Sequence, residues 1–374
     1  MKVKGNRFET IWIHPGNPGI VQIIDQRLLP FEFRIEDLHT FEDVFVAIRD
    51  MHLRGAPLIG AAGALGMYLA VIHYKGENID KEYISEKAAY IKSARPTAVN
   101  LSWAIDRVSE AIGNGGKRTE VSQTVHRICI QIIDEERENC LRIGQHGLAL
   151  IKEINYRKNQ DVVNILTHCN AGWLACIDYG TATAPIYLAH DSGIKVHVWV
   201  DETRPRNQGA RLTAWELQQH GVPCTVIADN TGGLLMQQGL VDMVLVGSDR
   251  ASPYGDIVNK IGTYLKALAA KDNSIPFYAA LPSSTIDWNL SEGAMETPIE
   301  QRNGDEVKLI EGIRDGEIYE VGITAPGVPV VNYGFDITPA RLVTGIITER
   351  GISNADKKSI FTLFPEKNIN PVSR

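Results

Sequence analysis

The chain has 374 residues, 44% of them hydrophobic and 22% charged, and a mean hydropathy of -0.12, values typical of soluble globular proteins. This composition excludes fibrous, disordered and disulfide-scaffold proteins. The 38 basic and 45 acidic residues give a net charge of -7, with no long basic run that could follow a nucleic-acid backbone. Any anionic ligand must therefore be held by a local group of cations.

The cysteines indicate a reducing compartment. There are five, at positions 129, 140, 169, 176 and 224, without CxxC spacing, so we expect free thiols, no disulfide and no cysteine-built zinc site. The first residues lack the apolar core of a signal peptide, and the most apolar uncharged stretch, 58–72, has only 15 residues. These features predict a cytoplasmic protein that binds neither membranes nor nucleic acids.

The first third of the chain predicts a short β segment followed by helices. Turn residues at 14–19 precede an apolar run at 20–24, which is typical of a small antiparallel sheet. Phe41, Val44, Ile48 and Met51 share one helical face, and Pro57 stands where a second helix would begin. Helical periodicity continues from residue 81 to residue 154.

From residue 162 onward, short apolar runs alternate with amphipathic segments, which is typical of βαβ units and a mainly parallel sheet. The runs are 162–166, 196–200, 225–228, 243–246 and 277–281. Residues 288–330 interrupt the pattern with a charged, glycine-containing excursion that is compatible with a loop or a hairpin. Thr338–Pro339 then predicts the start of another helix.

Length and pattern together predict an α/β protein of two domains, because domains average roughly 150 residues. The N-terminal domain, residues 1–130, is expected to be mostly helical with a small β segment. Residues 131–374 are expected to form a Rossmann-like domain with a mostly parallel sheet.

Two proton-transfer groups follow predicted strands directly. Cys169 comes after the run 162–166 and Asp249 after the run 243–246. Ligands of open parallel sheets bind beyond the carboxyl ends of the strands, so both are candidate catalytic residues. Each also has a purely structural interpretation: free cysteines usually pack as small hydrophobic residues, and an aspartate can cap a helix or pair with Arg250. His168 is expected to support its neighbours rather than to catalyse.

A phosphate site is predicted at Arg54, Gly55 and Ala56, just before the proline that begins a helix. Free amides at a helix N-terminus, together with a guanidinium group, bind anions. Arg95 and the pair Asn259–Lys260 add further polar or cationic groups among turn residues, although solvent-exposed cations are the common alternative.

Other familiar motifs are absent. Gly60, Gly63 and Gly66 have GxxGxxG spacing with no preceding strand, so a dinucleotide site is not supported and close helix packing explains them better. The sequence has no HExxH, P-loop or GxSxG motif. We therefore expect neither a metal nor an organic cofactor.

Ordered motifs between residues 24 and 352 resemble the methylthioribose-1-phosphate isomerase family, which is related in fold to the regulatory subunits of translation initiation factor 2B. The motifs lie at 24–30, 54–57, 95–101, 167–172, 202–213, 259–264, 282–287 and 335–339. The resemblance implies an aldose–ketose isomerase of methionine salvage, converting 5-methylthioribose 1-phosphate to 5-methylthioribulose 1-phosphate. It also implies a homodimer.

By the resemblance, the catalytic pair falls on Cys169 and Asp249. The sugar-phosphate contacts fall on Arg54, Gly55, Ala56, Arg95, Gln208, Asn259 and Lys260, of which Gln208, Gly55 and Ala56 depend mainly on the resemblance for their roles. The chain departs from the family pattern at Tyr333, Ser248, Ser102 and Trp173.

Three alternatives stay open at this point. The same isomerisation could act on 5-deoxyribose 1-phosphate or on ribose 1,5-bisphosphate, the latter with help from Arg204, Arg206 and Arg211. A third alternative is a non-catalytic interaction protein like the regulatory subunits, since site residues rather than fold decide function.

Overall fold

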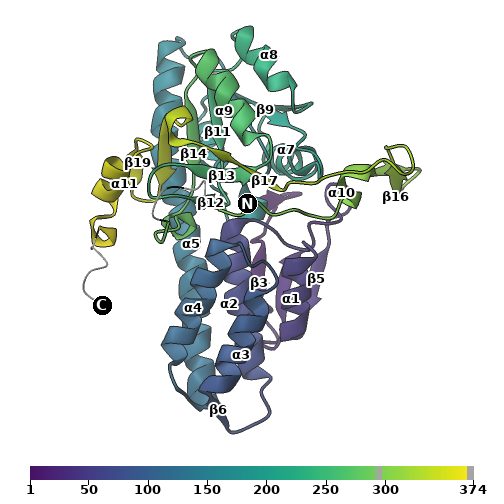
Figure 1. Cartoon of the computed structure of the whole chain (residues 1–374), viewed down its shortest axis with the longest axis vertical. Helices are drawn as coiled ribbons and strands as arrows, with labels where there is room; N and C mark the ends of the chain where they lie inside the picture. The colour runs from purple at the N-terminus through teal and green to yellow at the C-terminus, as the bar shows by residue number, and fades with distance from the viewer. Residues whose placement is uncertain (291–292, 294–296, 369–374) are drawn as a thin grey trace.

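The computed structural model describes all residues except 291–292, 294–296 and 369–374. Figure 1 shows helices α1 to α4 gathered in the lower half of the molecule, a strand-rich half above them, and the long helix α5 running through both. None of the described helices combines the length and apolar character needed to cross a membrane.

The N-terminal residues form the predicted antiparallel segment. A small hairpin, β1 (Lys2–Val3) and β2 (Asn6–Arg7), precedes a three-stranded sheet of β3 (Ile11–Ile13), β4 (Val21–Ile24) and β5 (Ile35–Leu38). All of its pairings are antiparallel.

Five helices follow: α1 (Phe41–Arg49), α2 (Ala56–Ile72), α3 (Lys81–Lys92), α4 (Val99–Ile112) and α5 (Arg118–Arg157). Thr40 and Asp43 form a reciprocal cap at the start of α1. Pro57 lies in the first turn of α2, and every residue of α2 except Ile72 is buried. A Cβ on Gly60 would lie 2.9 Å from the backbone oxygen of Asn100, so this glycine lets α2 and α4 pack closely.

Helix α5 has 40 residues and belongs to two cores. Its first half contributes Val125, Ile128 and Ile132 to the core of the helical half, and its second half contributes Ile143 and Ile151 to a core against the large sheet. The boundary predicted between residues 130 and 131 lies inside this unbroken helix.

The large sheet has seven strands in the order β10-β9-β8-β11-β14-β18-β19. These are β8 (Val163–Thr167), β9 (Val196–Asp201), β10 (Cys224–Ile227), β11 (Met243–Val246), β14 (Phe277–Ala280), β18 (Gly345–Thr348) and β19 (Gly351–Ser353). All neighbours are parallel except β18 and β19. The predicted mixed α/β chain with a mostly parallel sheet is therefore confirmed.

Helices cover both faces of this sheet. In β11, Met243 and Leu245 pack in one core while Val244 and Val246 pack in another. The first face is covered by α5, α6 (Ala184–Asp191) and α7 (Ala214–His220), and the second by α8 (Thr231–Gln237), α9 (Thr263–Asp272) and α11 (Lys357–Leu363). Burial on both faces explains why the strands are continuous apolar runs.

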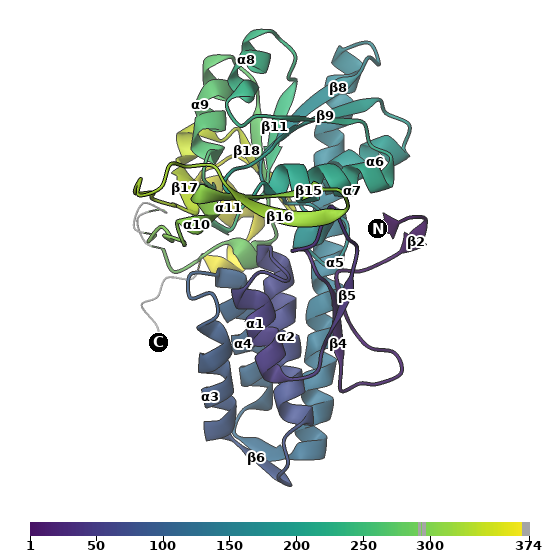
Figure 2. The same cartoon turned by 90° about the vertical axis from the view of Figure 1, so that its right-hand side faces the viewer.

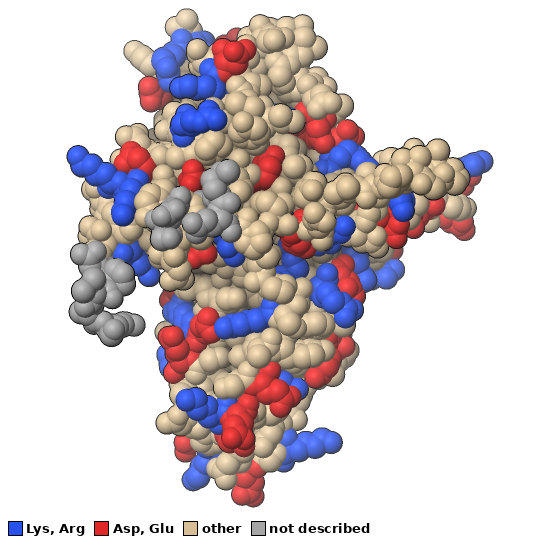
Figure 3. All heavy atoms as spheres, in the orientation of Figure 1, with Lys and Arg blue, Asp and Glu red and all other residues tan. Residues whose placement is uncertain are grey.

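The charged excursion contains a projecting hairpin. After the short helix α10 (Asp305–Lys308), the strands β15 (Leu309–Arg314) and β16 (Glu317–Gly322) form a two-stranded sheet that no other described strand joins, and they extend away from the body of the molecule (Figures 1 and 2). On the face seen in Figure 3, basic and acidic residues are interspersed over the surface rather than gathered by sign.

The helix predicted at Thr338–Pro339 is wrong. Thr338 ends β17 (Phe335–Thr338), which pairs with β13 (Ile257–Lys260); β13 pairs in turn with β12 (Arg250–Ala251). Pro339 is extended and leads into the single 3-10 turn Ala340–Leu342. Pairing with β13 provides hydrogen bonds that the local capping signal does not reveal.

Two isoleucines on opposite faces of α5 are predicted to differ in how much their replacement lowers the stability of the protein. Ile132 is fully buried, whereas Ile130 is 36% exposed. Ile132→Ala should lower the free energy of unfolding by about 2–5 kcal/mol, and Ile130→Ala by less than about 1 kcal/mol. Urea unfolding measures both, and equal effects would contradict the assignment of this helix face to the core.

Candidate active site

The strands β8 and β11 meet at the point where the strand order reverses. The chain proceeds outward from β8 to β9 and β10, then returns to the centre with β11 beside β8. The carboxyl ends on either side of such a switch point are the usual ligand site of an open α/β sheet. Cys169 follows β8 and Asp249 follows β11, so the two candidate catalytic residues belong to neighbouring strand ends.

Cys169 is fixed by its backbone and is buried. Its φ angle is +67°, and its amide donates to Thr203 Oγ1 at 2.9 Å. The thiol Sγ donates to Gln208 Oε1 at 3.4 Å. Burial raises the pKa of this thiol, while Arg54 and Lys260 act in the opposite direction. The thiol is therefore protonated at neutral pH.

A small cavity joins the helical half to the strand ends. Among the residues that line it are Arg54, Gly55, Ala56, Asp249 and Asn259. We call it the strand-end cavity. Its volume is about 20 Å³, which accommodates about one water molecule, so a sugar phosphate can enter only if the walls move apart.

Arg54 connects the two halves. Its Nη1 donates to both the backbone oxygen and Oδ1 of Asn170, each at 2.7 Å. Gly55 follows with a φ of +111°, and a Cβ there would lie 2.4 Å from Cα of Ala175. Only glycine allows this approach, which places the N-terminus of α2 against the turn that carries Cys169.

Lys260 and Asn259 reach the same region from the end of β13. Lys260 is buried, and its Nζ lies 4.7 Å from the ring centre of Phe335. Burial lowers the pKa of Lys260, whereas the nearby Cys169 and Asp249 act to raise it. Asn259 is also buried, with its Nδ2 donating to Thr263 Oγ1 at 3.1 Å.

Arg95 does not line the strand-end cavity. It lies in the turn between α3 and α4 and forms an ion pair with Glu300 at 3.4 Å. The predicted residues that line the cavity are Arg54, Gly55, Ala56, Asp249 and Asn259. Cys169 itself is not among the lining residues; Gln208 contacts its thiol, and Lys260 is close enough to act on its pKa.

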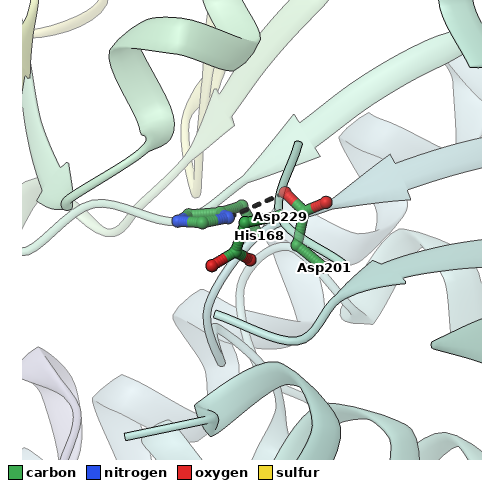
Figure 4. Close-up of side chains that lie close together, drawn as sticks. All are labelled: His168, Asp201 and Asp229. Carbon is green, nitrogen blue, oxygen red and sulfur yellow. Dashed lines mark hydrogen bonds and ion pairs between the residues drawn. The ribbon is translucent and has the colours of Figure 1, made fainter. Parts of the chain in front are cut away.

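His168, directly before Cys169, supports the strand ends. Its Nδ1 lies 2.8 Å from Asp201 Oδ2 (Figure 4). Its Nε2 lies 2.8 Å from the backbone oxygen of Ile261. Both partners of the ring are hydrogen-bond acceptors. The ring thereby ties the end of β8 to the residue that follows Lys260.

Figure 4 also shows Asp229 beside this pair, and the three side chains have ligand atoms within 4.8 Å of one another, as a metal site would require. Three of their four carboxylate oxygens are engaged, while Asp201 Oδ1 has no hydrogen-bond partner among the described residues. Lys266 Nζ lies 3.2 Å from Asp201 Oδ2, and both carboxylate oxygens of Asp229 accept backbone amides, from Thr203 at 2.7 Å and Arg204 at 2.8 Å. We interpret the cluster as an ion-paired support.

Sequence reasoning missed the roles of Asn170, Asp201 and Lys266. Asn170 stands in the turn after β8, so its position beside Cys169 was a usable signal. Asp201 and Lys266 are 33 and 98 positions from His168, and no local pattern connects them.

The four departures from the family pattern differ in location. Ser248 lines the strand-end cavity, and Ser102 lines a separate groove beside α4 and α5. Trp173 is fully buried, whereas Tyr333 is 48% exposed. Of the four, only Ser248 borders that cavity in the structure.

Comparison with known proteins identifies the family. The Initiation factor 2 subunit family matches residues 52–355. A protein from Desulfatibacillum aliphaticivorans named methylthioribose-1-phosphate isomerase is 55% identical over 98% of this chain and 100% of its own length. The chain belongs to the methylthioribose-1-phosphate isomerase family. As a member it is an enzyme of the aldose–ketose isomerase class.

Other relatives agree with this assignment. A methylthioribose-1-phosphate isomerase of Sinorhizobium medicae is 51% identical over 98% of this chain and 100% of its own. The crystal structure of 5-methylthioribose 1-phosphate isomerase from Pyrococcus horikoshii OT3 has a TM-score of 0.82 at 38% identity, covering 96% of this chain and 97% of that one. The structure of translation initiation factor eIF-2B, subunit delta, from A. fulgidus has a TM-score of 0.79 at 34% identity, covering 96% and 100%.

The surroundings of Cys169 predict how its thiol titrates. Thiolate absorbance at 240 nm, taken as native protein minus Cys169→Ser, should rise only above the ordinary cysteine range, because burial raises the thiol pKa. Lys260→Met should move the midpoint further up, since it removes a cation that favours the thiolate. Lys271→Met, at an exposed position on α9, should leave it unchanged. A midpoint below pH 7 would contradict this electrostatic description.

Proposed function

We propose that the chain converts 5-methylthioribose 1-phosphate to 5-methylthioribulose 1-phosphate, as a step of methionine salvage. The observation that carries this proposal is the convergence of three features: Cys169 and Asp249 at adjacent strand ends, and the buried Arg54 at the N-terminus of α2. The names of the relatives at 50–55% identity supply the substrate.

The phosphate is proposed to bind at the start of α2. Gly55 and Ala56 stand at the start of α2, where backbone amides have no partner within the helix, and Arg54 and Lys260 add positive charge in a buried setting. Asn259 and Gln208 are left to contact the phosphate or the sugar hydroxyls. Arg95 would reach the phosphate only by leaving Glu300.

The chemistry needs an acid for the ring oxygen and a route for one hydrogen. The bond between C1 and the ring oxygen breaks, and the ring oxygen gains a proton. One hydrogen moves from C2 to C1, and the C2 hydroxyl loses its proton to become the ketone, so no external oxidant or reductant is consumed. We assign Asp249 to the ring oxygen or the C2 hydroxyl and Cys169 to the hydrogen between C1 and C2.

Because the thiol of Cys169 is protonated before the reaction, it cannot act as a base in the first step. Because burial raises its pKa, the thiol carries a proton before substrate binds. It can accept a proton from carbon only after releasing its own, for which the flanking Arg54 and Lys260 favour the thiolate. Until the proton is released, the hydrogen bond to Gln208 Oε1 orients the thiol.

The surroundings argue against a bisphosphate substrate. Arg206 pairs with Glu306 at 2.9 Å, Arg211 pairs with Glu311, and Arg204 donates to the backbone oxygen of Val307 at 2.9 Å. All three arginines therefore contact residues of the 288–330 excursion rather than a second phosphate group.

The second alternative substrate is 5-deoxyribose 1-phosphate. Comparing kcat/KM for this sugar and for 5-methylthioribose 1-phosphate distinguishes the two, and we expect the methylthio sugar to be preferred.

A non-catalytic role is less well supported. The initiation factor subunit is 34% identical to this chain, against 55% for the isomerase from Desulfatibacillum. Both proposed catalytic groups are present and lie at neighbouring strand ends.

From the family resemblance we also propose a homodimer that works in the cytoplasm. Sedimentation analysis of the purified chain tests the dimer.

The catalytic pair predicts a loss of turnover without a loss of binding. Cys169→Ser and Asp249→Asn should each reduce kcat at least about 1000-fold, since each removes an acid/base group. The dissociation constant for the sugar phosphate should change less than about threefold. Isomerisation is followed by formation of the ketose and binding by calorimetry, and full turnover in either variant would refute the assignment.

Replacement of Arg54 is expected to weaken substrate binding, in contrast to the catalytic variants, which are expected to lose turnover. Arg54→Gln should raise the dissociation constant for the sugar phosphate about tenfold or more, because a buried charge-assisted contact is lost. Arg49→Gln, at the exposed end of α1, is the matched control and should leave affinity unchanged. Unchanged affinity in Arg54→Gln would remove Arg54 from the phosphate site.

A further inference from the structure

A second, larger hollow lies beside α4 and α5, where the helical half meets the segment after β14 and the turn between β18 and β19. Its volume is about 860 Å³, within the range of small-molecule sites. We call it the α4–α5 groove. It is separated from the strand-end cavity by one stretch of backbone, since Pro282 lines that cavity and Ser283 and Ser284 line the groove.

A buried carboxylate without a full set of partners lines the groove. Glu136, on α5, is 1% exposed; its Oε1 accepts from Ser284 Oγ at 2.9 Å, while its Oε2 has no hydrogen-bond partner in the described part of the chain. Burial, reinforced by Glu349, raises the pKa of Glu136 to about 7. Leaving such an oxygen unpaired is costly, so the site favours a donor from outside the chain.

Glu349 adds a second negative charge close by. It is 9% exposed, and its Oε2 accepts the backbone amide of Ser283 at 2.9 Å. Ser284 also accepts from Asn100 Nδ2 at 2.9 Å. The Ser284 hydroxyl therefore already accepts from Asn100 and donates to Oε1 of Glu136, and it has no second proton to donate to Oε2.

The cations that line the groove are committed elsewhere. Within the described ranges, each pairs with a group other than Glu136 and Glu349: Arg107 with Glu135, Arg142 with Glu138, Arg250 with Asp287, Arg350 with Glu366, and Lys367 over the ring of Trp288. Among the described residues, no cation forms an ion pair with either buried carboxylate, although the charge of Arg107 acts on Glu136 from a distance. A cation that enters the groove would supply the missing partner.

We propose that the α4–α5 groove binds an organic cation, a primary amine or guanidinium group on an apolar stem. The charged end donates to Glu136 and Glu349, and the stem lies along Trp103 and Ile286, which also line the groove. A divalent metal ion would require a fuller set of oxygen ligands than these two carboxylates supply. This site does not depend on the proposed isomerase reaction.

The test uses calorimetric titration of the full chain with agmatine and with 1,4-diaminobutane, and 1,4-butanediol as the neutral isostere of the latter. Saturable binding of at least one cation and none of the diol is expected. Glu136→Gln should weaken that binding about tenfold or more, because a charge-assisted hydrogen bond is lost. Glu110→Gln, an exposed acid that lines the same groove, should change it less than twofold.

Glu349→Gln provides a second variant, with a loss of similar size, should Glu136→Gln fail to fold. Absence of saturable binding by both cations, or equal binding by Glu136→Gln and Glu349→Gln, would overturn the proposal. Sedimentation of the same samples distinguishes another occupant: if neither cation binds and Glu136→Gln dissociates an oligomer, the groove is a contact between copies of the chain.

Discussion

The contact between Arg54 and Asn170 joins the two halves of the molecule at the point where the chemistry is proposed. The guanidinium comes from the loop before α2, and the oxygens that receive it come from the turn after β8. The same approach requires Gly55, because any side chain there would collide with Ala175. This contact therefore brings the start of α2, where the phosphate is proposed to bind, close to the turn that carries the thiol, and neither half alone contains the proposed site.

The electrostatics of the site follow from burial. Arg54, Lys260 and Lys266 are all buried, while Asp201 is the buried carboxylate that pairs with Lys266 and His168. Removing cations from water is costly unless an anion replaces the lost solvation. In the proposed reaction, the phosphate group of the substrate would supply that anion, and a chain with a net charge of -7 could then still bind a negatively charged ligand.

Much of this arrangement could be predicted from sequence because it depends on local patterns. The apolar runs marked the parallel strands, and Cys169 and Asp249 stood directly after two of them. Helical periodicity was predicted as far as residue 154, but not that one helix, α5, would cross the predicted boundary between residues 130 and 131, because its apolar face packs in a different core on each side. The support of His168 by Asp201 and Lys266, and the pairing of Thr338 in β17, depend on contacts between distant segments, which leave no periodic trace in the chain.

The continuity of α5 also constrains how the molecule moves. A sugar phosphate cannot enter a 20 Å³ cavity without separation of the two halves, yet α5 is packed into the cores of both. A helix that contributes buried side chains to both cores limits how the two halves can move apart, because any change in their relative position must either bend α5 or displace those side chains.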